Sequence, residues 1–133
     1  MSYHLFVYGS LTTALAHPMG HRLRQEALFI GPARIGGRLY RVGWYPGLRP
    51  PESPGEVVHG EVYRLANAEW SLAWLDAYEG IGPGGTAGAS GDPYLRAERT
   101  VCMADGSQLI AWVYLYQLPL PVDARILDGI WRG

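Results

Sequence analysis

A glutamate within an apolar stripe is the first candidate for chemistry. Residues 67–80, NAEWSLAWLDAYEG, have the pattern of a helix in which Leu72, Leu75 and Glu79 follow the spacing i, i+3, i+7. These side chains fall on one side of the helix, together with Leu65. Burial removes water from a carboxylate and raises its pKa toward neutrality, the range that a general acid or base needs at physiological pH. Glu79 is therefore a candidate catalytic residue.

An ordinary structural role is the main alternative for Glu79. A glutamate in the last turn of a helix can bend out to water or pair with an arginine, such as Arg96 or Arg99. Most glutamates in such positions are solvated or paired, so the helical pattern alone favours this alternative.

The other side chains of this helix indicate two further faces. Trp70, Trp74 and Tyr78 recur at i, i+4, i+8 and form a second apolar stripe, so we expect protein core around most of the helix. Glu69 and Asp76 lie seven residues apart on a different face, which we expect to be solvated.

A turn near the N-terminus is the second candidate site. The sequence YGSL at residues 8–11 follows a β-prone run. A serine nucleophile at Ser10 is disfavoured because the G-x-S-x-G elbow is missing and the sequence places no Asp or His beside it. Small residues after a buried strand instead let backbone N–H groups point at an anion such as a carboxylate. An ordinary tight turn is an equal alternative.

Metal and phosphate sites are disfavoured. His17 and His21 are four residues apart, but Pro18 and Gly20 disfavour a regular helix there and no third ligand is evident. The glycine-rich residues 82–91 lack both the G-x-x-x-x-G-K-[ST] motif and any lysine.

Composition limits the partners and the compartment. Eleven Lys and Arg against twelve Asp and Glu give a net charge of −1, which lacks the basic excess of a nucleic-acid-binding surface. No run approaches the roughly 20 apolar residues of a membrane span, and no leader pattern is visible, so we expect a cytoplasmic protein without a membrane partner. The one cysteine, Cys102, cannot form an internal disulfide, and we expect it to be a small buried apolar residue.

The first half of the chain is predicted to be mainly β-structure. Alternating or apolar runs, broken by glycine and proline, define the segments. These are a buried strand at Tyr3–Tyr8, a loop or short helix at Thr12–Gln25, several short bent antiparallel strands at Ala27–Leu48, an exposed turn at Arg49–Gly55 and a strand at Val57–Leu65.

The second half is predicted to hold the main helix and a hairpin. Asn67 can cap the helix at its start and Gly80 can end it in the left-handed C′ position. Six glycines at 80–93 predict a mobile loop. After it we expect a hairpin of Arg96–Met103 and Gln108–Leu118, which turns at Asp105-Gly106, and one short helix at Val122–Trp131.

Several short motifs, in order along nearly the whole chain, resemble the γ-glutamylcyclotransferase or AIG2-like family. Any single motif is weak, but the ordered set is specific. They are V-Y-G-S-L at 7–11, F-x-G-x-A-x-I-x-G-x-L-Y at 29–40, G-x-Y-P-x-L at 43–48, G-E-V-Y at 60–63, L-D-A-Y-E-G at 75–80, Y-L-R at 94–96 and A-W-V-Y at 111–114.

The resemblance implies an α+β fold: a compact mixed β-barrel flanked by a few helices, as a single domain over residues 1–133. It implies a cavity between the YGSL turn and the helix that ends in LDAYEG. The glycine-rich loop at 80–93 is longer than the family leads us to expect, and it is either a lid or a disordered insertion.

The resemblance also assigns roles to individual residues. The family's catalytic glutamate corresponds to Glu79, the residue that the helical pattern singles out. Backbone groups of the family's turn hold the α-amino acid end of a γ-glutamyl substrate, which corresponds here to Tyr8, Gly9, Ser10 and Leu11. Tyr94 matches a tyrosine beside the site, and Tyr45 with Pro46 matches a segment of the pocket wall.

The implied reaction is the cyclisation of a γ-glutamyl amine or γ-glutamyl amino acid to 5-oxoproline with release of the free amine. It is metal-independent and needs no cofactor. The alternative is a non-catalytic module that uses the same cavity to bind a small carboxylated ligand or a peptide end. Exposed aromatic residues could form the interface of a homodimer, although no sequence pattern demonstrates one.

Overall fold

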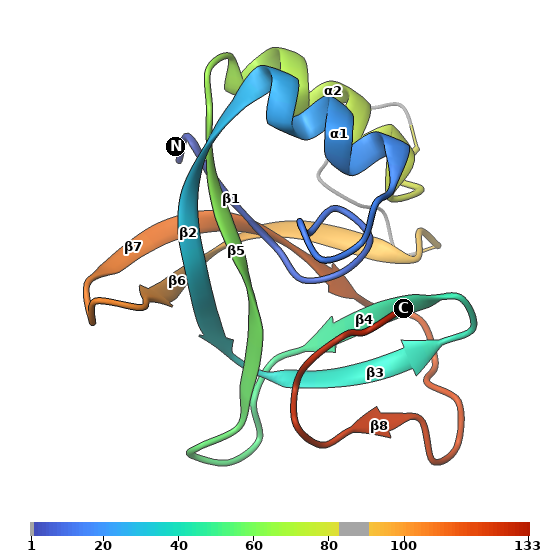
Figure 1. The fold of residues 1–133 in the computed structure, drawn as a ribbon. Helices are drawn as coiled ribbons and strands as arrows, with labels where there is room; N and C mark the ends of the chain where they lie inside the picture. The colour runs from blue at the N-terminus through green and yellow to red at the C-terminus, as the bar shows by residue number, and fades with distance from the viewer. Residues whose placement is uncertain (1, 83–90) are drawn as a thin grey trace.

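The computed structural model describes residues 2–82 and 91–133. The prediction of a mobile loop at 80–93 falls mainly on residues 83–90, which lie outside this description. The described residues form eight strands and two helices (Figure 1). In chain order these are β1 His4–Val7, α1 Pro18–Glu26, β2 Ala27–Gly36, β3 Arg38–Val42, β4 Tyr45–Arg49, β5 Val57–Leu65, α2 Ala68–Tyr78, β6 Tyr94–Met103, β7 Gln108–Tyr116 and β8 Arg125–Ile126.

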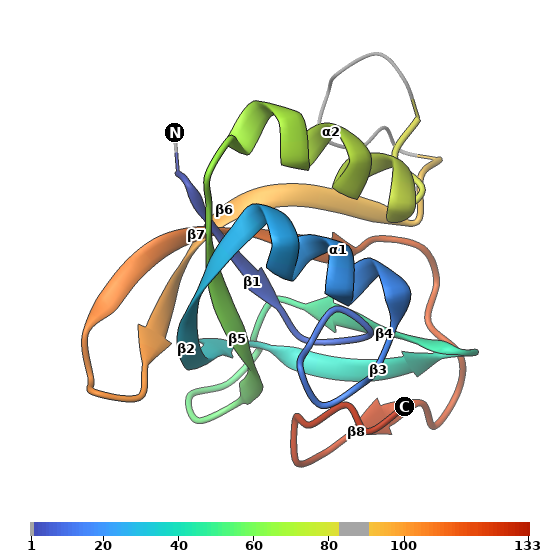
Figure 2. The same ribbon diagram turned by 45° about the horizontal axis from the view of Figure 1, so that its top comes forward.

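Five strands close into a barrel in the order β1, β5, β2, β6, β7. Strand β1 runs antiparallel to β5 and parallel to β7, so the barrel is mixed. The register of β2 against β5 shifts between Phe29 and Gly31, which bends this ten-residue strand. Both helices lie on one side of the barrel, and the three-stranded sheet β4-β3-β8 lies on the other (Figures 1 and 2). This arrangement confirms the predicted α+β fold with a mixed barrel.

The first strand explains how two cores form on either side of one sheet. Because successive side chains of a strand point to opposite faces, Leu5 and Val7 pack in the cluster under the helices. Phe6 packs in the cluster toward the three-stranded sheet. A strand buried on both faces must be apolar throughout, which is why the segment is predictable from sequence. The turn that follows β1 is therefore anchored in the centre of the molecule.

The prediction of a helix at Val122–Trp131 is wrong. The tail forms the short strand β8 and turns, with Asp123 and Gly129 at φ of 57° and 68°. Its backbone bonds to the sheet, since His59 N donates to Gly129 O at 2.9 Å and Arg41 N donates to Ala124 O at 2.8 Å. These long-range backbone hydrogen bonds outweigh the weak helix propensity of a segment with left-handed residues.

The main helix begins and ends as its sequence predicts. The Asn67 side chain accepts from Trp70 N at 3.1 Å, which caps the first turn of α2. Gly80 follows the helix with φ of +81°, a conformation that costs little only for glycine. Leu72 and Leu75 are 3% and 0% exposed, so their stripe faces the core. The cap residue Glu79 continues this line at the end of the helix.

The other faces of α2 correct two predictions. Trp70 is 64% exposed, so the core does not surround the helix on the second apolar stripe. Trp74 is half-buried and donates its indole N–H to the carboxylate of Glu26 in α1 at 2.8 Å. Asp76 is not on a solvated face, because it pairs with Arg96 of β6. A helix that packs on the barrel can bury a polar side chain where a strand supplies a hydrogen-bonding or charged partner for it.

The hairpin of β6 and β7 turns at Asp105-Gly106 as predicted, with Gly106 at φ of +87°. Cys102 on β6 is half-buried rather than buried, and it lies at the turn end of this hairpin, where it pairs with Gln108. Neither helix in the described part of the chain is long and apolar enough to span a bilayer.

Candidate active site

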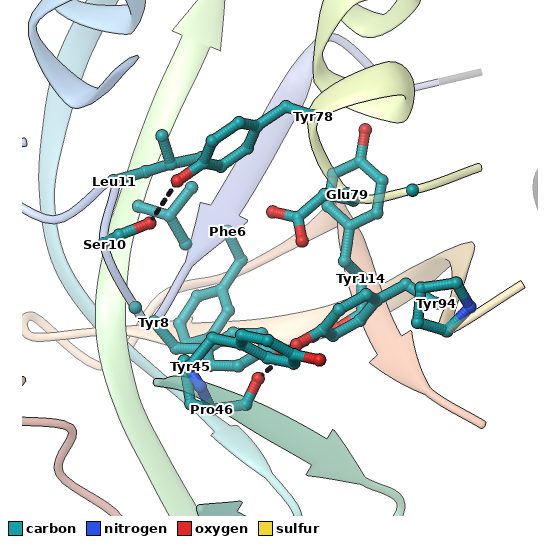
Figure 3. A pocket seen from close by; sticks show the side chains of 14 residues that line it. Phe6, Tyr8, Ser10, Leu11, Tyr45, Pro46, Tyr78, Glu79, Tyr94 and Tyr114 are labelled. Carbon is teal, nitrogen blue, oxygen red and sulfur yellow. Dashed lines mark hydrogen bonds between the residues drawn. The ribbon is translucent and has the colours of Figure 1, made fainter. Parts of the chain in front are cut away.

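A cavity of about 360 Å³ lies between the turn after β1 and the C-terminal end of α2 (Figure 3). Its walls are rich in aromatic side chains, and Glu79 is the one charged side chain among the described residues that line it. The size suits a small molecule. The lining residues are Phe6, Val7, Tyr8, Gly9, Ser10, Leu11, Tyr45, Pro46, Tyr78, Glu79, Gly80, Pro93, Tyr94 and Tyr114.

The turn at the cavity wall contains two backbone donors that have no partner among the described residues. Thr12 donates to Gly9 O through its N–H at 3.0 Å and through its hydroxyl at 2.8 Å, so Ser10 and Leu11 occupy the centre of a tight turn. The N–H groups of Ser10 and Leu11 donate to no residue that the structure describes. A Cβ at Gly9 would lie 2.8 Å from Pro46 Cγ, so only glycine lets the turn approach the β4 wall this closely.

The side chain of Glu79 is half-buried, and its carboxyl group has no hydrogen-bond or ion-pair partner among the described residues. The backbone of Glu79 closes α2 by donating to Leu75 O at 2.9 Å, and its side chain points into the cavity (Figure 3). Burial, with a smaller contribution from the negative charge of Asp76, raises the pKa of Glu79 to about 7. Such a carboxyl group can give or take a proton near neutral pH.

The two arginines that could pair with Glu79 have other partners. Arg96 donates to the carboxylate of Asp76 at 2.7 Å and 3.0 Å, and the hydroxyl of Tyr114 donates to the same carboxylate at 2.6 Å. Arg99 donates to the backbone O of Glu98 instead. Neither arginine pairs with Glu79, so the ion-pair alternative for this residue is wrong.

Tyrosine hydroxyls hold the walls of the cavity in place. The Tyr94 hydroxyl donates to Pro46 O, which ties β6 to β4, and its ring packs against Tyr45 with centroids 6.3 Å apart. The Tyr8 hydroxyl donates to Tyr114 O and ties the turn after β1 to β7. Burial raises the pKa of Tyr8 and of Tyr94 well above the ordinary value, so both hydroxyls stay protonated.

Ser10 has no catalytic triad around it in the described residues. Its hydroxyl lies 2.7 Å from the hydroxyl of Tyr78, the last residue of α2 (Figure 3). Residues 2–82 and 91–133 also bring together no group of three His, Cys, Asp or Glu side chains that could hold a metal ion.

All residues predicted for the site line this one cavity: Tyr8, Gly9, Ser10, Leu11, Tyr45, Glu79 and Tyr94. Sequence reasoning missed Phe6, Tyr78 and Tyr114 as lining residues. Tyr78 precedes Glu79 in the L-D-A-Y-E-G motif but was assigned to an apolar stripe. Tyr114 belongs to the A-W-V-Y motif, and strand alternation from the buried Tyr116 gave a signal that it faces inward.

Comparison with known proteins assigns the family. The family model described as gamma-glutamyl cyclotransferase, AIG2-like, matches residues 5–133. The chain belongs to this family. It is similar to the gamma-glutamylcyclotransferase family protein YtfP of Citrobacter rodentium, at 37% identity over 96% of this chain and 93% of that protein. The YtfP protein of Escherichia coli K12 is 36% identical, over 96% and 94% of the two chains.

Solved structures share the fold. YkqA from Bacillus subtilis superposes with a TM-score of 0.71 at 25% identity, over 98% of this chain and 40% of YkqA. An AIG2-like protein from Mus musculus superposes with a TM-score of 0.64 at 22% identity, over 98% and 95%. The barrel and its flanking helices are therefore a shared architecture.

Proposed function

We propose that the protein converts a γ-glutamyl amine or γ-glutamyl amino acid to 5-oxoproline and the free amine, with Glu79 as general base and then general acid. The observation that carries this proposal is the half-buried carboxyl group of Glu79, which has a pKa of about 7 and lines one cavity with Ser10 and Leu11. Neither this carboxyl group nor the N–H groups of Ser10 and Leu11 have a partner among the described residues. Family membership supports the reaction class.

The proposed reaction needs little more than positioning and proton transfer. Ionised Glu79 takes a proton from the substrate's α-ammonium group, and the freed amine attacks the γ-carbonyl carbon to close a five-membered ring. The new C–N bond forms as the C–N bond to the leaving amine breaks, and Glu79 returns the first proton to that amine. The ring nitrogen loses a second proton, which ends on the released amine, so the amine leaves as an ammonium ion. Because both reacting groups belong to one molecule, the cavity mainly folds the substrate into attack geometry.

The turn supplies the complementary binding group. The α-carboxylate of a γ-glutamyl substrate is an anion, and the N–H groups of Ser10 and Leu11 are donors without described partners. Placing the carboxylate on these donors leaves the α-ammonium free to face Glu79 across the cavity. This pose puts the base next to the proton that it must remove.

A carboxyl group with a near-neutral pKa favours an enzyme over a binding module. A buried acid without a partner destabilises the folded protein, and a module that only binds a carboxylate gains nothing from a second negative charge in its pocket. The proposed chemistry, in contrast, requires this group.

Product analysis tests the proposal. Wild-type protein is incubated with a panel of γ-glutamyl amino acids and γ-glutamyl amines, and 5-oxoproline and free amine are quantified together. We expect the two products in equal amounts. Release of glutamate instead of 5-oxoproline contradicts cyclisation, and binding of panel members without any product supports the binding module.

A further inference from the structure

A chain of three side chains leads from helix α1 to the cavity. The Ser10 hydroxyl lies 2.7 Å from the Tyr78 hydroxyl, which lies 3.5 Å from Nε2 of His17. The rings of His17 and Tyr78 meet edge to face, with centroids 5.8 Å apart. The chain links the residue that caps α1, the last residue of α2 and the turn after β1.

The cap of α1 fixes the proton on the histidine. Met19 N donates to Nδ1 of His17 at 3.1 Å, so Nδ1 acts as an acceptor and carries no proton. In a neutral imidazole the proton then sits on Nε2. His17 Nε2–H therefore donates to the oxygen of Tyr78.

The direction of the hydrogen bond from His17 to Tyr78 determines the direction of the hydrogen bond between Tyr78 and Ser10. Because the Tyr78 oxygen accepts from His17, its own hydrogen is free to point to Ser10. A phenol is also a more acidic donor than the hydroxyl of a serine. Burial raises the pKa of Tyr78, and the charge of Glu79 adds to this shift, so the hydroxyl keeps its proton. Ser10 thus accepts from Tyr78, and its own hydrogen is left for the cavity that it lines.

We propose that His17 and Tyr78 are positioning residues that orient the Ser10 hydroxyl as a donor to the substrate's α-carboxylate, beside the N–H groups of the turn. This inference rests on the proposed function because it takes a γ-glutamyl compound as the ligand. It adds a side-chain donor to a site that otherwise consists of backbone. Without His17, the Tyr78 oxygen is free to accept, and the Ser10 hydroxyl can turn back and donate to it. Without the Tyr78 hydroxyl, the Ser10 hydroxyl loses the partner that orients it.

Ligand binding to a catalytically inactive variant tests whether His17 and Tyr78 orient the Ser10 hydroxyl. Calorimetry in a Glu79→Gln background compares γ-glutamylmethylamide with its α-carboxamide analogue, which lacks the negative charge. Hydrogen bonds to charged groups are stronger than neutral ones. We expect Ser10→Ala and Tyr78→Phe to weaken binding of the carboxylate ligand about tenfold, and of the carboxamide about threefold or less. Tyr3→Phe, on the exposed N-terminal segment, is the control.

Two substitutions of His17 separate its hydrogen bond to Tyr78 from its role as the cap of α1. The oxygen of His17→Asn can replace Nδ1 as the cap, whereas the amide N–H of His17→Gln can replace Nε2–H as the donor. We expect Asn to weaken carboxylate binding selectively and Gln to preserve it, although Gln lowers the melting temperature more. His21→Asn, on the exposed face of the same helix, is the control.

Three outcomes overturn the inference. They are equal losses for the two ligands, a loss with His17→Gln but not with His17→Asn, and no binding of either ligand to the Glu79→Gln protein. The proposed function is judged separately, by 5-oxoproline from the wild type. If the variants lose carboxylate binding selectively but the wild type forms no 5-oxoproline, the proposed reaction is rejected and the role of His17 and Tyr78 stands. If the wild type forms 5-oxoproline but the variants show no such selective loss, the reaction stands and this role is rejected.

Discussion

Arg96 binds the carboxylate of Asp76 through two N–H groups, Nε to Oδ1 at 2.7 Å and Nη2 to Oδ2 at 3.0 Å. Asp76 lies three residues before Glu79 in the same helix, so the two acids share one neighbourhood and only Asp76 has the cation. Its charge still raises the pKa of Glu79. The ion pair thus leaves Glu79 as the group that titrates near neutral pH.

The rate of the proposed reaction should depend on the ionisation of Glu79. The ionised form of Glu79, which acts as the base, predominates only above its pKa of about 7, so kcat/KM should rise with pH through this value. Rates between pH 5 and 9 test this. Glu69→Gln, an exposed acid of the same helix, should keep the wild-type profile. A profile without a limb near 7 contradicts the role of Glu79 as base.

Glu79 should also make stability depend on pH. Its pKa is higher in the folded state, about 7, than the ordinary value of 4.5, so folding takes up a proton between these values. The free energy of unfolding should therefore fall as pH rises from 4.5 to 7, by up to about 3 kcal/mol from this group.

Denaturant unfolding of wild type and Glu79→Gln at several pH values measures this effect. The neutral variant should lack the fall and should be more stable than wild type at pH 8. A variant that is less stable than wild type at pH 8 shows that Glu79 is stabilised by a partner.

Removing the neighbouring charge should shift the rate profile. Asp76→Asn takes away the charge that raises the pKa of Glu79 and frees the Arg96 cation, so the limb of kcat/KM should move to lower pH. Stability should drop by roughly 2–4 kcal/mol because the half-buried ion pair is broken.

Glu56→Gln serves as the matched control for Asp76→Asn. It breaks the ion pair between the Glu56 carboxylate and Nη2 of Arg125, which are 3.1 Å apart. Arg125 belongs to β8 of the three-stranded sheet. It should lower stability without moving the limb. If both variants leave the limb in place, the interaction between Asp76 and Glu79 is too weak to matter.

The charge of the leaving amine should affect turnover. Glu79 is the one charged side chain among the described residues that line the cavity, so its ionised carboxylate repels a carboxylate on the leaving amine. We expect γ-glutamylalaninamide to be converted with about tenfold higher kcat/KM than γ-glutamylalanine, a substrate of nearly the same shape. Equal values, or a preference for γ-glutamylalanine, contradict this expectation.

The fold was predictable where local patterns agree with long-range contacts. The apolar run of β1 and the capped helix α2 both follow from side-chain periodicity and from turn chemistry. The tail from 122 to 131 was not predictable in the same way. Its strand β8 exists because β3 offers Leu39 opposite Ile126, a pairing with no local signal.

The site was predictable to a similar depth. The position of Glu79 in an apolar stripe singles it out, but the pattern could not decide between burial and an ion pair. That decision depends on Arg96, which lies 17 residues further along the chain and reaches Asp76 only because β6 passes beside α2. Likewise, the contact of Tyr78 with Ser10 joins two segments whose sequences carry no sign of each other.

Steady-state and binding measurements on Glu79→Gln test the central claim most directly. The substitution keeps the size of the side chain but removes its ability to exchange a proton. With a γ-glutamyl substrate from which the wild type releases 5-oxoproline, kcat should fall by about 10² to 10⁴ while the Kd of the substrate changes little. A kcat close to the wild-type value would show that Glu79 is not the acid and base of the reaction.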